Sequence, residues 1–182
     1  MHQEKETYIP AQIFLGAVHG ASRQEALNLK WDDIDFNYDG KGIITLSRSK
    51  TGIVRTEFLM PRTRQALLDW KSHLDFVRKR KRIFPVREEI VFCRLNGVPI
   101  KRFDSAWNTI CRIAGFDDLN HHDLRHSFCD NLILSGSDLK EVKEVIGHKD
   151  LASTDRYSHL TKLHKRHTQE KLAAHYARDE KV

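Results

Sequence analysis

The feature that most constrains the fold is a long stripe of apolar residues at helical spacing. It begins after Pro61, and its members recur at intervals of three and four: Ala66, Leu67, Trp70, Leu74 and Val77. This spacing places side chains on one face of a helix. Proline suits a first helical turn, where its missing N–H would have no partner. The segment therefore predicts a long helix that starts at Pro61 and buries one face.

Strand and turn signals come directly before this helix. Asp39-Gly40 separates Ile34–Phe36 from Gly42–Leu46, and both turn residues tolerate the positive φ that a tight turn needs. A second turn, Lys50-Thr51-Gly52, leads into Val54–Met60. The segments predict a small antiparallel sheet.

The rest of the chain is mainly helical in pattern. We expect further helices near Ile9–Val18, Arg23–Lys30, Arg102–Ala114, Asp123–Ser135, Leu139–Ile146 and Lys162–Ala177, and a short extended segment at Ile90–Phe92. Asp138 with Glu141 forms a capping-box pattern, and Gly136 is placed to end the preceding helix. The predicted fold class is α+β, mainly α, with the sheet on one edge and a single domain over residues 1–182.

Composition limits the partners. Lys and Arg number 31 against 25 Asp and Glu, a net charge of +6 that favours a polyanionic partner. The sequence has no apolar run near the roughly 18 residues that would suggest a membrane helix, so we expect no membrane partner. Three cysteines without CxxC spacing are typical of a reducing compartment and predict a cytoplasmic protein.

Residues suited to phosphate chemistry gather in the second half of the chain. His122 and Arg125 are three apart, so they share one face at a helix start. The arginine fork suits a phosphate, and a histidine beside it can move a proton near neutral pH. Tyr157, nine residues after His148, offers a phenolic oxygen as a nucleophile.

This order resembles the second signature box of the tyrosine site-specific recombinases, the phage integrase family. That box runs H-x-x-R, a helical spacer, L-G-H, and a tyrosine nine residues later; here Ile146 replaces the leucine. The segment Ser47–Thr56 resembles the family's β-hairpin, in which a lysine before a glycine turn reaches the scissile phosphate. Lys50 is the matching residue.

Gly20–Asp35 resembles the family's first box, G-x-R-x-x-E-x-L-x-L-x-W-x-D-I-D, with one departure. Ser22 stands at the arginine position, and Arg23 follows one residue later. One residue along a helix is about 100° of rotation. Two readings stay open: Arg23 reaches the phosphate from an altered helix start, which we favour, or the site lacks one guanidinium.

The resemblance implies an integrase-like catalytic domain and a mechanism without metal or cofactor. In it, the scissile phosphate is held by Arg23, Arg125 and His148, while His122 assists proton transfer. Lys50 protonates the departing 5′ oxygen. Tyr157 attacks and forms a 3′-phosphotyrosyl intermediate, which a 5′-hydroxyl from another strand resolves.

The resemblance also implies the partners: double-stranded DNA and a homotetramer on paired DNA sites, with a monomer in the absence of DNA. The family usually carries an N-terminal DNA-binding domain, so we expect this chain to be a fragment of a longer protein that supplies it. Two alternatives stay open, a catalytically silent DNA-binding relative and an enzyme like a type IB topoisomerase.

Overall fold

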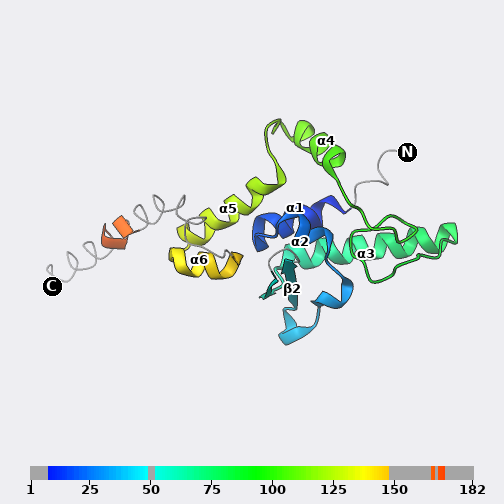
Figure 1. Ribbon diagram of the computed structural model, residues 1–182, viewed down its shortest axis with the longest axis horizontal. Coiled ribbons are helices and arrows are strands. Elements are labelled where there is room, and N and C mark those ends of the chain that lie inside the picture. The colour runs from blue at the N-terminus through cyan, green and yellow to red at the C-terminus, as the bar shows by residue number, and fades with distance from the viewer. Residues whose placement is uncertain (1–7, 49–51, 148–164, 167, 171–182) are drawn as a thin grey trace, which may run out of the picture. The chain divides into compact units, whose positions relative to one another are not determined.

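The computed structural model describes residues 8–48, 52–147, 165–166 and 168–170 (Figure 1). Contacts divide the chain into a first unit, Met1–His126, and a second unit, Ser127–Val182. In chain order the elements are α1 (Ile9–His19), α2 (Arg23–Leu27), η1 (Trp31–Asp33), β1 (Ile34–Asp35), η2 (Tyr38–Gly40), β2 (Ile43–Arg48), β3 (Ile53–Phe58), α3 (Pro61–Lys81), α4 (Asp104–Ala114), α5 (His121–Leu134) and α6 (Leu139–Ile146).

The sheet of the first unit is antiparallel, with the order β1-β2-β3. Ile43 pairs with Phe58 at one end of the β2–β3 ladder, and Arg48 pairs with Ile53 at the other. The turn between β1 and β2 has positive φ at Asp39 (48°) and Gly40 (66°). The predicted antiparallel sheet and its turn are therefore confirmed.

The predicted long helix is confirmed as α3, which starts at Pro61. Its buried face carries the five predicted apolar residues together with Thr63. Helix α1 packs against this face and against α2, and α2 also contacts β2. The Trp70 indole donates a hydrogen bond of 2.7 Å to the Val91 carbonyl, which ties α3 to the extended segment beyond it.

Helix α1 ends at His19, one residue beyond the predicted Val18, and its C-cap Gly20 has a left-handed φ of 57°. Helix α2 is shorter than predicted: it ends at Leu27, whereas the sequence pattern favoured helix as far as Lys30. The reason is a long-range backbone contact. The Val91 N–H donates to the Leu29 carbonyl at 3.0 Å, and Lys30 forms an antiparallel bridge with Ile90.

Helices α4 and α5 differ from their predicted starts by two residues. Helix α4 begins at Asp104, after the Phe103 N-cap. Helix α5 begins at His121, because the Asn120 side chain accepts from the His122 N–H at 2.9 Å. The Asp123 carboxylate in turn accepts from the Asn120 N–H at 2.8 Å. These bonds satisfy N–H groups that a helix start would otherwise leave unpaired.

The second unit has its own small core. Phe128, Cys129 and Ile133 from α5 pack with Val142 and Ile146 from α6. The predicted cap of α6 is confirmed, since the Asp138 carboxylate accepts from the Glu141 N–H at 2.8 Å and Glu141 returns a bond to the Asp138 N–H. The predicted helix Lys162–Ala177 lies mostly outside the described residues.

Within the described ranges, no helix combines the length and apolar character needed to cross a membrane.

Candidate active site

The structure describes three of the six predicted site residues: Arg23, His122 and Arg125. The other three, Lys50, His148 and Tyr157, lie outside the described residues. All three described residues belong to the first unit. Their contacts are therefore described within that unit.

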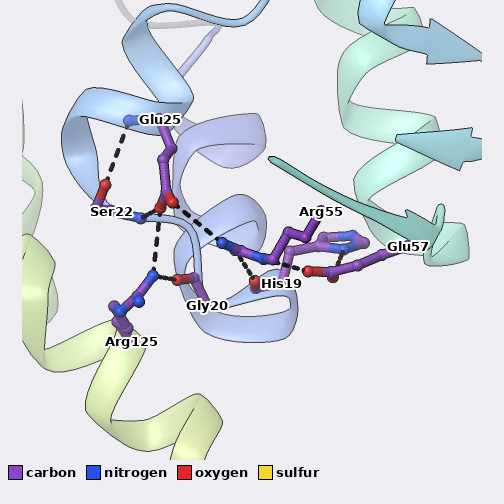
Figure 2. A network of polar contacts seen from close by, with 7 residues as sticks. All are labelled: His19, Gly20, Ser22, Glu25, Arg55, Glu57 and Arg125. Atoms are coloured by element: carbon purple, nitrogen blue, oxygen red, sulfur yellow. Dashed lines mark hydrogen bonds and ion pairs between the residues drawn. The ribbon is translucent and has the colours of Figure 1, made fainter. Parts of the chain in front are cut away.

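Glu25 stands at the centre of the buried part of this site (Figure 2). It lies in the first turn of α2, where it forms a capping box with Ser22. The Ser22 N–H donates to Glu25 Oε2 at 2.6 Å, and the Glu25 N–H donates to Ser22 Oγ at 3.3 Å. The serine at the departure from the family pattern is therefore the N-cap of α2.

Two arginines from distant parts of the chain meet on the Glu25 carboxylate (Figure 2). Arg125 Nη1 lies 3.3 Å from Glu25 Oε2, and Arg55 Nη1 donates to Oε1 at 3.1 Å. Arg125 also donates to the Gly20 carbonyl. Arg125 is 2% exposed, so its guanidinium is fixed inside the protein by the end of α1 and the start of α2.

The electrostatics keep Glu25 ionised. Burial alone would raise the pKa of this carboxyl group, but Arg55, the Ser22 N–H and Arg125 together bring its pKa below the ordinary value. A buried carboxylate that accepts several hydrogen bonds from cations and N–H groups is stabilised in its charged form. Glu25 is therefore an anion that orients two cations.

The network continues from Arg55 to α1 and α3. Arg55 Nε donates to Glu57 Oε1 at 2.6 Å, and Nη2 donates to the His19 carbonyl at 2.8 Å. Glu57 Oε2 lies 3.0 Å from His19 Nδ1, and His19 Nε2 lies 3.1 Å from Thr63 Oγ1. Sequence analysis missed Arg55, Glu57 and His19. Arg55 and Glu57 are only two positions apart, but the contacts that join them to Glu25 and His19, 30 and 38 positions away, leave no local pattern.

Arg23 and His122 line one open pocket with a volume of about 570 Å³. Ser22, Asp104, Trp107, Asn108, Asn120 and His121 also belong to its lining. Arg23 Nη1 donates to Asp104 Oδ1 at 2.6 Å, and the Arg23 side chain is 49% exposed. The Arg102 Nε donates to the other Asp104 oxygen at 2.8 Å. Both arginines are thus paired at the surface.

His121 forms the buried wall next to this pocket. Its ring makes edge contacts with Phe103 and Trp107, and its Nε2 lies 3.4 Å from the Gln12 carbonyl oxygen. Burial lowers the pKa of His121 from 6.5 to about 4, and the positive charge of Arg23 adds to this effect. His121 is therefore neutral near neutral pH, and the exposed His122 beside it faces solvent.

The predicted residues thus fall into two environments. Arg23 and His122 share the open pocket with Ser22, whereas Arg125 is locked into the buried network. Glu25 connects the two, because its capping box sets the start of α2 from which Arg23 projects. Over the described part of the chain, no group of three or more His, Cys, Asp or Glu side chains is placed to hold a metal ion.

The model of the phage integrase family matches residues 4–164, which covers most of the chain. The chain therefore belongs to the phage integrase family. The match spans both of the segments that carry the family's pattern in the sequence.

Curated relatives are tyrosine recombinases. A XerC of Staphylococcus epidermidis is 28% identical over 146 residues, which is 78% of this chain and 46% of the relative. A XerD of Corynebacterium glutamicum is 33% identical over 155 residues, 78% of this chain and 45% of the relative. The chain thus spans about half the length of these relatives.

Solved structures agree on the fold. XerH site-specific recombinase, bound to its difH substrate in a pre-cleavage complex, superimposes with a TM-score of 0.68 at 24% identity, over 86% of this chain and 44% of that one. The catalytic domain of bacteriophage HP1 integrase gives 0.57 at 16% identity, over 93% of this chain and 92% of that domain. The predicted integrase-like fold class, mainly helical with a small antiparallel sheet, is confirmed.

Proposed function

We propose that this chain is the catalytic domain of a tyrosine recombinase, which cuts and rejoins double-stranded DNA through Tyr157. The observation that carries the proposal is the family match over residues 4–164, which includes the ordered set from Arg23 to Tyr157. The fixed guanidinium of Arg125 supports it. Phosphoryl transfer depends mainly on a positioned nucleophile and on preorganised positive charge.

The proposed roles follow the chemistry of each group. Arg125 and His148 hold the scissile phosphate, and His122, exposed at the start of α5, assists proton transfer. Tyr157 attacks the phosphorus atom and expels the 5′ oxygen, to which Lys50 supplies a proton. The 3′-phosphotyrosyl ester keeps the energy of the broken bond, so a 5′-hydroxyl can reverse the step without a cofactor.

We assign the second phosphate contact to Arg23. Its side chain lies in the pocket that His122 also lines, whereas the Ser22 side chain is occupied by the cap of α2. The partner that Arg23 has in this structure, Asp104, is itself 39% exposed. An exposed ion pair is screened by water and contributes little, so a DNA phosphate can displace Asp104 from Arg23.

The proposal also covers the DNA partner, the oligomeric state and the cellular compartment. The Tn1549 transposon integrase, a structural neighbour, was solved in complex with transposon right end DNA, and the net charge of +6 suits the same polyanion here. We propose a homotetramer on paired DNA sites, a monomer without DNA, and action in the cytoplasm. No disulfide joins the described cysteines Cys93, Cys111 and Cys129, which are all buried, and this agrees with a reducing compartment.

A covalent-trapping experiment tests the function. The chain is incubated with a library of nicked duplexes of randomised sequence, and DNA that stays attached to denatured protein is recovered and sequenced. We expect a recovered consensus site with wild-type protein, and no adduct but unchanged binding with Tyr157→Phe.

The outcomes separate the alternatives. Binding of duplex DNA without any adduct would identify a silent DNA-binding relative. Relaxation of supercoiled plasmid by a monomer, without exchange between two sites, would identify an enzyme like a type IB topoisomerase. Adducts that persist with Tyr157→Phe would remove Tyr157 from the mechanism.

A further inference from the structure

Arg55 makes more side-chain hydrogen bonds than we expect for a surface arginine on a β-hairpin. Each of its guanidinium nitrogens donates to a different acceptor: Nε to Glu57, Nη1 to Glu25 and Nη2 to the His19 carbonyl. Its side chain is only 8% exposed. A planar guanidinium fixed at three points has a single orientation, so Arg55 cannot turn toward a DNA phosphate without breaking buried bonds.

Arg55 and Arg125 contact the same carboxylate, that of Glu25, so the orientation of Arg55 affects the position of Arg125. Arg55 contacts Glu25 Oε1, while Arg125 and the Ser22 N–H contact Oε2. Because a carboxylate is planar, a bond that fixes Oε1 also fixes the direction of Oε2. Arg55 therefore limits the rotation of the group against which Arg125 is placed.

The charges of the buried side chains also link Arg55 to Arg125. Arg55 and Arg125 bring two buried cations, and Glu25 and Glu57 bring two carboxylates. The family pattern places an arginine three residues before this glutamate, where this chain has Ser22. The structure thus provides a guanidinium for Glu25 from β3, at Arg55 of the hairpin segment.

We propose that Arg55 is a positioning residue for DNA cleavage, which acts through Glu25 to hold the guanidinium of Arg125 in its reactive orientation. The inference rests on the proposed function, since it assigns Arg125 to the scissile phosphate. Arg55 itself touches no substrate. Its contribution is to the geometry of the phosphate contact and not to DNA affinity.

The test compares Arg55→Lys with Arg64→Lys as a matched control. Both variants keep the charge, and Arg64 lies outside the network, where its Nε donates to the Phe36 carbonyl at 3.3 Å. On the duplex recovered by trapping, we expect Arg55→Lys to slow adduct formation about tenfold to a hundredfold, as misplaced reactive groups do. DNA affinity should change less than about twofold, because Arg55 is buried and makes no contact with the DNA in this proposal.

A double variant makes the coupling specific. Arg125→Lys should be slow by itself, and adding Arg55→Lys should slow it little further, because residues of one network do not act additively. If Arg55→Lys fails to fold, Glu57→Gln takes its place, since it weakens the hold on Arg55 Nε. Equal rates for Arg55→Lys and Arg64→Lys, or independent effects of Arg55 and Arg125, would overturn the proposal.

A second measurement does not depend on activity. Exchange of the Arg125 guanidinium protons, followed by nuclear magnetic resonance on the free chain, should accelerate in Arg55→Lys and stay unchanged in Arg64→Lys. If wild-type protein forms no adduct, the proposed function fails, and this measurement alone decides the coupling: unchanged exchange in Arg55→Lys overturns it.

Discussion

Two sets of charged side chains meet at the start of α2, and they differ in how their charges are held. In the buried set, Glu25 binds Arg55 and Arg125 and all three side chains are nearly inaccessible. In the exposed set, Arg23 and Arg102 share Asp104 at the protein surface. Both sets pair arginine with carboxylate, yet only the first has a fixed geometry.

The difference assigns different tasks to the two sets. A buried ion pair cannot be released without leaving a charge out of water, so it serves to orient groups. An exposed pair exchanges easily with solvent ions, so it can give up its arginine to a phosphate. We therefore infer that the buried set prepares the site before DNA arrives, and that the exposed set responds to DNA.

The largest effect is expected from breaking the buried set. Glu25→Ala removes the carboxylate that Arg55 and Arg125 share, and loss of one member of a buried ion pair costs about 3–5 kcal/mol. Urea unfolding should show this loss in the free energy of unfolding. Gln24→Ala, at the exposed neighbouring position of α2, is the control and should change little. A similar small change for Glu25→Ala would mean that the network does not stabilise the fold.

His121, which lines the pocket beside Arg23, should make stability depend on pH. Its pKa is about 4 in the folded protein against 6.5 ordinarily. Below pH 6.5 the unfolded chain takes up a proton that the folded chain refuses, so stability falls as the pH falls from about 6.5 to about 4. The difference corresponds to about 3 kcal/mol.

Urea unfolding across this pH range measures the effect of His121. His121→Phe keeps an aromatic ring beside Phe103 and Trp107 and should remove most of this pH dependence. His73→Phe, on α3 against Trp70, is the control and should keep it. An unchanged pH dependence in His121→Phe would show that other groups cause it.

The exposed set can be tested at its arginine. Arg23→Ala should slow covalent adduct formation on the order of 10²-fold, which is typical of a lost charge-stabilising donor. Ser22→Arg should help little, because it removes the cap of α2, at a cost of about 1 kcal/mol. Arg102→Ala removes the other arginine that binds Asp104 and is the control. Faster cleavage by Ser22→Arg would instead show that the site lacks its first arginine.

The smallest effect is expected at Asp104. Asp104→Asn removes the carboxylate that competes with phosphate for Arg23, and we expect DNA affinity to rise about twofold at low salt. Fluorescence anisotropy at two salt concentrations measures this change, and the thermal midpoint should stay constant. A fall in affinity would argue that Asp104 holds Arg23 in its DNA-binding position.

Sequence reasoning reached those parts of the molecule that depend on local rules. The Asp39-Gly40 turn, the proline start of α3 and the Asp138 cap follow from the conformations that single residues allow, and all are confirmed. The end of α2 was wrong because a backbone contact between Leu29 and Val91 overrides the helical pattern. The catalytic roles predicted for all six site residues stay predictions.

The buried network could not be predicted from the sequence, because it too depends on contacts between distant parts of the chain. Arg55 follows a turn of the hairpin, where an arginine is normally solvated, and its partners come from α1, α2 and β3. Only packing of these elements makes their side chains neighbours. Arg125 was found because the family pattern marks it, but its burial and its bond to Glu25 required the structure.

The capping box of α2 has a consequence for populations of the protein in solution. A helix of five residues is too short to persist without outside contacts, and here one carboxylate both caps it and holds Arg125. When α2 frays, Arg125 therefore loses its bond to Glu25. Under the proposed role of Arg125, the fraction of molecules ready to react cannot exceed the fraction in which this short turn of backbone is closed, and we expect temperature or denaturant to reduce that fraction before the domain unfolds.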